Sequence, residues 1–169
     1  NDGAFVEVTA QMFQRLGHEA FHAYLENYVF PHDEYHVPVW LNEGLATMFE
    51  TGLLETGTLR VDAPHPRFLP LLQEALRRGN TMSLRRVLRA GPGDFVDKQP
   101  GVTAQSYASA WGLAYYLSFE RDLLGRSSLE HYVDGAAGLE PVARFERLVG
   151  QPLDEFARQW RSLMLALGP

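Results

Sequence analysis

Apolar residues at helical spacing run along most of this 169-residue chain, and this pattern constrains the fold more than any other feature. In residues 9–27, Phe13, Leu16, Ala20 and Tyr24 recur at intervals of three or four, which places them on one face of a helix. The same reading predicts further helices over residues 39–50, 66–78, 83–89, 103–121, 128–136, 141–149 and 153–167. We therefore expect a mainly α fold.

The predicted helices leave few residues that could form strands. Residues 4–8, AFVEV, alternate in polarity and could form one short strand, and residues 57–61, GTLRV, could form another. The sequence thus predicts at most a few short strands.

Composition narrows the classes of protein that the chain can belong to. Hydrophobic residues make up 46% and charged residues 21%, as in a globular protein with a real core, and the length suits a single domain over residues 1–169. The net charge of −6 argues against a nucleic-acid partner, because phosphate binding needs a basic face. No apolar run approaches the ~20 residues of a membrane span. The chain begins at Asn1 rather than methionine, so we expect a fragment of a longer or processed protein.

The pentapeptide HEAFH, residues 18–22, carries the first chemical signal. Residues four apart project from the same face of a helix, so His18 and His22 can offer ring nitrogens to one metal ion. Glu19 lies about 100° around the helix from His18, where a carboxylate can take a proton from a metal-activated water. The chain has no cysteine, so a metal here would be held by nitrogen and oxygen. The alternative is a histidine pair on the surface of an ordinary helix.

A third ligand is available in WLNEGLA, residues 40–46. A catalytic zinc site keeps three protein ligands and leaves the fourth position to water. Glu43 lies 21 residues beyond His22, near the start of the next predicted helix, and Gly44 allows close approach of helices. Alone, Glu43 would be read as an acidic residue favoured in the first turn of a helix.

HEAFH followed by WLNEGLA resembles the gluzincin metallopeptidases, and most of all the bacterial peptidase MA-like domains. Residues 107–117 and 145–164 are similar to later helices of those domains. The resemblance implies a zincin-like domain with two antiparallel active-site helices, and Zn²⁺ held by His18, His22 and Glu43. It also implies Glu19 as general base, a peptide or protein substrate, and an extracytoplasmic location (secreted, periplasmic or envelope).

Two departures from the family pattern bear on the chemistry. Related peptidases carry a β-sheet before the active helix, whose edge aligns an extended substrate, and only eight residues precede the helix predicted here. An acidic residue that orients a histidine often stands four positions after the glutamate ligand. Thr47 occupies that position in this chain, with Glu50 one turn further along.

A peptidase also needs a group that stabilises the oxyanion, and related enzymes use a downstream Tyr or His. Our candidate is Tyr107, expected in the first turn of the helix that follows the loop over residues 95–106; the alternative is an ordinary core aromatic. Tyr115, Tyr116 and His131 are weaker candidates. His32 and His36 are also four apart, but they are read as surface-loop residues because prolines bound their segment.

Three hypotheses therefore stand. The leading one is a zinc-dependent peptidase. The second is a zinc-binding domain with weak catalysis that serves recognition. The third is a helical interaction module without metal.

Overall fold

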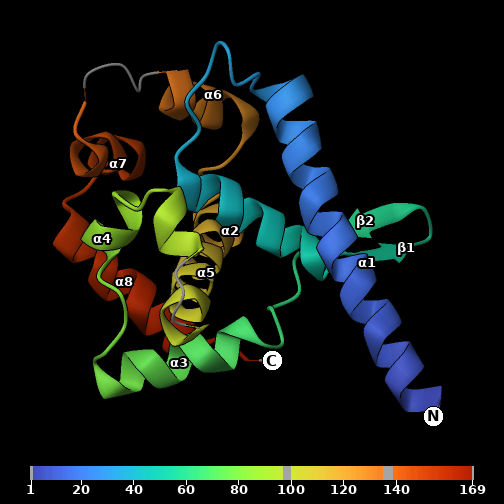
Figure 1. The fold of residues 1–169 in the computed structure, drawn as a ribbon. Coiled ribbons are helices and arrows are strands. Elements are labelled where there is room, and N and C mark those ends of the chain that lie inside the picture. The colour runs from blue at the N-terminus through green and yellow to red at the C-terminus, as the bar shows by residue number, and fades with distance from the viewer. Residues whose placement is uncertain (1, 97–99, 135–138, 169) are drawn as a thin grey trace.

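The computed structural model describes residues 2–96, 100–134 and 139–168. Eight α-helices dominate these residues, so the predicted mainly α fold is confirmed (Figure 1). The helices are α1 Asp2–Tyr24, α2 Val39–Glu50, α3 Phe68–Arg78, α4 Leu84–Leu88, α5 Pro100–Tyr115, α6 Arg126–Asp134, α7 Pro141–Val149 and α8 Leu153–Ala166. Two π-helical turns, η1 Leu25–Val29 and η3 Tyr116–Glu120, continue α1 and α5, and η2 Pro92–Phe95 is a 3₁₀ turn. No helix in the described ranges is long and apolar enough to cross a membrane.

The start of α1 differs from the sequence prediction. The sequence allowed one short strand over residues 4–8, but these residues are helical, because α1 begins at Asp2 and continues without a break. Extending an existing helix adds one hydrogen bond for each residue fixed, whereas starting a separate element carries its own ordering cost. The remaining predicted helices are observed with ends shifted by a few residues, and residues 135–136 of the predicted helix 128–136 lie outside the described residues.

One β-hairpin interrupts the helices. Strands β1 Leu53–Glu55 and β2 Thr58–Arg60 pair antiparallel, and β2 is the predicted strand over residues 57–61, shortened at both ends. The turn residues Thr56 and Gly57 both have positive φ, 49° and 83°. A two-residue turn of this kind matches the right-handed twist of the strands it joins.

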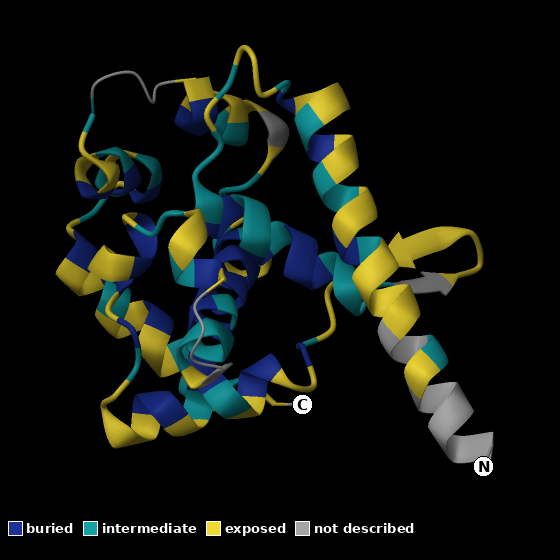
Figure 2. Ribbon diagram, in the orientation of Figure 1, coloured by how far each residue is buried: buried dark blue, intermediate teal, exposed yellow. Residues whose placement is uncertain are grey.

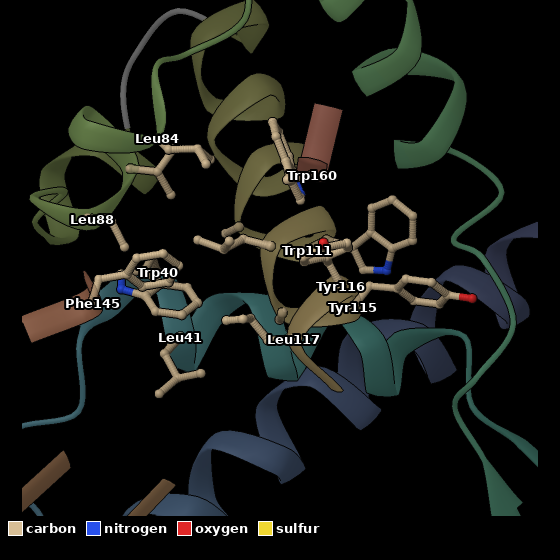
Figure 3. Packing of buried hydrophobic residues seen from close by; sticks show 14 of the residues in the cluster. Trp40, Leu41, Leu84, Leu88, Trp111, Tyr115, Tyr116, Leu117, Phe145 and Trp160 are labelled. Carbon is tan, nitrogen blue, oxygen red and sulfur yellow. The ribbon is translucent and has the colours of Figure 1, made fainter. Parts of the chain in front are cut away.

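The core is built around α5, which runs through the middle of the molecule (Figures 1 and 2). Trp111 and Leu117 are fully buried, and the core that surrounds α5 includes Trp40 and Leu41 of α2, Leu84 and Leu88 of α4, Phe145 of α7 and Trp160 of α8 (Figure 3). The Nε1–H of Trp160 on α8 donates a hydrogen bond of 3.0 Å to the carbonyl oxygen of Gly112, which ties α8 to α5. Trp111 and Trp160 therefore belong to the core rather than to a binding surface.

Gly44 sets how closely α2 packs on α5. A Cβ at this position would lie 2.5 Å from the carbonyl oxygen of Ala110 and 2.9 Å from the Cβ of Ala114. The close approach that we expected from this glycine is real, but its partner is α5 rather than α1. Because α2 is pressed against α5 on one side, its other side faces α1.

Helices α1 and α2 run antiparallel where they meet. His22, late in α1, contacts Asn42 early in α2, while His18, one turn earlier, contacts Glu50 at the end of α2. Large apolar side chains of the α1–η1 segment remain exposed, namely Val8, Met12, Phe13, Leu16, Tyr24, Tyr28 and Val29. The α1–α2 contact therefore has a polar centre, and the candidate site lies there.

Candidate metal centre

Three potential ligand atoms converge between α1 and α2. The Nε2 atoms of His18 and His22 are 3.0 Å apart, and the Oε2 atom of Glu43 lies 3.3 Å from the first and 3.7 Å from the second. No other group of three such residues comes this close in the part of the chain that the structure describes. The structure thus brings together the three residues that the sequence singled out.

The outer ring nitrogens fix the orientation of both histidines. The Nδ1 atom of His18 lies 2.7 Å from Oε1 of Glu50, and Nδ1 of His22 lies 2.9 Å from Oδ1 of Asn42. Asn42 is oriented in turn, because its amide nitrogen donates to Glu26 at 2.8 Å. Both Nδ1 atoms face acceptors and must carry the proton, so each neutral ring presents an Nε2 lone pair to the centre.

This donor set fits a zinc ion. The ligand atoms of a tetrahedral zinc at about 2.1 Å lie about 3.4 Å from one another, and the observed separations of 3.0, 3.3 and 3.7 Å bracket that value. Oε2 of Glu43 is buried, and the two Nε2 atoms lie at ion-pair distance from it. Two Nε2 lone pairs and a carboxylate oxygen facing one another repel unless a cation or protons lie between them.

Without metal, protons take the place of the cation. Burial opposes charge on His18, but hydrogen bonds and attraction from Glu43 and Glu50 outweigh it and raise the pKa to about 9. The pKa of His22 is also raised, chiefly by its hydrogen bond to Glu43. Burial disfavours charge on Glu43 as well, yet the two histidines lower its pKa to about 2. The metal-free centre is therefore a charged cluster, and its protons compete with a metal.

Glu50, rather than Thr47, is the residue that orients the His18 ring. Thr47 Oγ1 donates to the carbonyl oxygen of Glu43 at 2.7 Å, so it bonds within its own helix and orients no histidine. The contact that orients His18 comes from Glu50 instead. Glu50 lies two turns after Glu43 on the same side of α2 and takes the His18 Nδ1–H directly.

His65 supports Glu50 from a loop and was missed in the sequence. It is buried, and its Nδ1 accepts the backbone N–H groups of Arg67 and Phe68, both at 3.2 Å. That leaves the proton on Nε2, which lies 3.4 Å from Oε2 of Glu50. The segment PHP, residues 64–66, has no periodicity that could have indicated this position.

A cleft of about 580 Å³ opens beside the centre. His18, Glu19 and Tyr107 all line it, and Glu19 is exposed there. Glu19, the residue that the sequence predicts as general base, therefore lies at this cleft.

Tyr107 lies beside His18, in the third turn of α5 rather than the expected first turn, because α5 begins at Pro100. Its ring centroid is 6.2 Å from that of His18, and the ring also packs on Phe68 and Phe95. Burial, followed by the charge of Glu43, raises the pKa of Tyr107 to about 12. The hydroxyl thus stays protonated near neutral pH and can donate a hydrogen bond into the cleft.

The other candidates do not line the cleft. Tyr115 donates to a backbone carbonyl oxygen at 3.0 Å, Tyr116 is buried in the core, and His131 is exposed on α6. His32 and His36 are exposed in the loop before α2, as expected.

The chain belongs to a protein family described as a protein of unknown function, DUF1570, whose profile matches residues 13–142. The matched span includes all three candidate ligands, Glu50, His65 and Tyr107. No curated protein matches the chain. No solved structure matches it either.

Proposed function

We propose that this protein is a zinc-dependent peptidase. The observation that carries the proposal is that two Nε2 atoms, each oriented by a hydrogen bond at Nδ1, converge with a buried carboxylate oxygen beside an open cleft. Helix packing alone gives no reason to gather two histidines and a glutamate at one point between two helices, whereas a catalytic zinc needs such a set.

The chain's own residues divide the remaining work. Zinc at this position would polarise a substrate carbonyl and acidify water. Glu19, exposed in the cleft and next in sequence to His18, takes the proton from the attacking water and passes it to the leaving nitrogen. Tyr107 donates its hydroxyl proton in a hydrogen bond to the oxygen that becomes negative. Glu50 and Asn42 keep the two histidines in the tautomer that binds metal.

A Glu19→Gln variant tests this assignment. It should retain zinc while losing peptide hydrolysis by a factor of ~10²–10⁴, because the amide cannot accept the proton. Glu120→Gln, an exposed glutamate in η3, is the matched control and should keep wild-type activity. An unchanged rate in Glu19→Gln would overturn the mechanism.

The wild-type protein separates the remaining hypotheses. Zinc bound without hydrolysis of any peptide in a broad mixture would favour the recognition domain. Absence of zinc binding would favour the interaction module.

A further inference from the structure

The cleft beside the metal centre contains two arginines that have no part in the mechanism. Arg15, on α1, precedes His18 by one turn, and Arg67 lies at the start of α3; both line the cleft and both are exposed. Two cations at one open cleft constrain what can bind there.

Neither guanidinium is paired with an acid. No carboxylate of the described residues lies within 4.0 Å of Arg15 or Arg67. Arg15 and Glu19 are four apart on one helix, a spacing at which such pairs commonly form, yet they form no ion pair here. Both arginines therefore keep their donors available for a ligand.

Arg67 is held in place. Its backbone N–H donates to Nδ1 of the buried His65 at 3.2 Å, and its guanidinium carbon lies 5.4 Å from the ring centroid of Phe68. The Phe68 ring is stacked on that of Tyr107, with centroids 6.3 Å apart. The Arg67 guanidinium thus packs on Phe68, which in turn stacks on Tyr107 beside the metal centre.

The charges at the cleft favour an anion. Glu43 and Glu50 carry two negative charges, which balance those of a divalent zinc ion. Glu19 adds one more negative charge, whereas Arg15 and Arg67 add two positive charges. The cleft therefore keeps an excess of one positive charge. Arginine is the side chain best suited to bidentate recognition of carboxylate.

We propose that Arg15 and Arg67 form a carboxylate subsite, so that the substrate is a peptide with a carboxylate close to the bond that is cut. This inference rests on the proposed peptidase function. The cleft volume of about 580 Å³ lies within the range of ligand pockets, about 300–1,000 Å³. The carboxylate can come from the C-terminus of a short peptide or from an Asp or Glu side chain.

The test uses three hydroxamate dipeptides, in which the hydroxamate anchors each probe on zinc. The first ends in a free carboxylate, the second in an amide, and the third in an amide with glutamate as its last residue. Binding to the zinc-loaded chain is measured by calorimetry. The free-carboxylate probe should bind ~10- to 100-fold more tightly than the neutral amide, as expected for hydrogen bonds to a charged group. Equally tight binding of the glutamate probe would assign the subsite to acidic side chains, and weak binding would assign it to the C-terminus.

Arginine variants locate the effect. Arg15→Gln and Arg67→Gln should each reduce the preference for the carboxylate probe and leave binding of the neutral amide unchanged. Arg67→Lys should retain part of the preference, and Arg158→Gln, an exposed arginine on α8, should retain all of it. Equal binding of all three probes to the wild type would overturn the carboxylate subsite while the peptidase proposal stands. Failure of all three to bind would contradict the zinc site itself.

Discussion

Glu50 provides a quantitative test of the site, because it contacts the cluster without being one of the three ligands. Its Oε1 accepts the Nδ1–H of His18 at 2.7 Å, a short, charge-assisted hydrogen bond. Loss of such an outer partner typically costs 10- to 100-fold in metal affinity. Glu50→Gln keeps an acceptor oxygen but loses the charge, so we expect zinc affinity to fall about tenfold, or about 1.4 kcal/mol. Glu50→Ala removes the acceptor altogether, so we expect its zinc affinity to fall about 100-fold, or about 2.7 kcal/mol.

The measurement is a competition titration for zinc against a coloured chelator of known affinity, at constant pH and ionic strength. Glu120→Gln removes the same charge far from the centre and should bind zinc like the wild type. Circular dichroism of each variant verifies that the fold is retained. A zinc Kd within twofold of the wild type in both Glu50 variants would refute the claim that Glu50 orients His18 toward a metal.

Three further predictions follow from the same geometry. Because His18 is protonated below a pKa of about 9 in the metal-free protein, zinc binding at pH 7 should release at least one proton. Apparent zinc affinity should then rise with pH up to about 9, which calorimetry in buffers of different ionisation enthalpy will show. Gly44→Ala should destabilise the protein by about 1–3 kcal/mol in urea unfolding, since its Cβ would lie 2.5 Å from the carbonyl oxygen of Ala110. Gly101→Ala, where a Cβ meets open space, should not destabilise. Tyr107→Phe should keep zinc bound but lower the rate of hydrolysis by ~10²–10³. An unchanged rate would show that Tyr107 is an ordinary core aromatic.

Helical spacing in the sequence was sufficient to predict the site residues that lie on one helix or on two helices in contact. The four-residue spacing of His18 and His22 places both rings on one face, and a carboxylate near the start of the next helix, Glu43, completes the set. Glu50 could have been found in the same way, because it lies seven residues, or two turns, after Glu43 on the same side of α2.

Other parts depend on tertiary contacts that no local pattern carries. His65 lies in the loop between β2 and α3, and it meets Glu50, at the end of α2, only in the folded chain. The place of Arg15 and Arg67 at the same cleft likewise depends on the fold. For residues 4–8 the local pattern was ambiguous, because five alternating residues fit a strand or a helix. The continuation of α1 through this segment makes it helical.

Zinc content per chain after exhaustive dialysis tests the central claim most directly, with wild-type protein and Glu43→Ala prepared in parallel. Close to one zinc per chain in the wild type, falling sharply in Glu43→Ala while the helical circular dichroism is retained, is the result predicted by the three-ligand centre. No retained zinc in folded wild-type protein, even after zinc is added back, would contradict it.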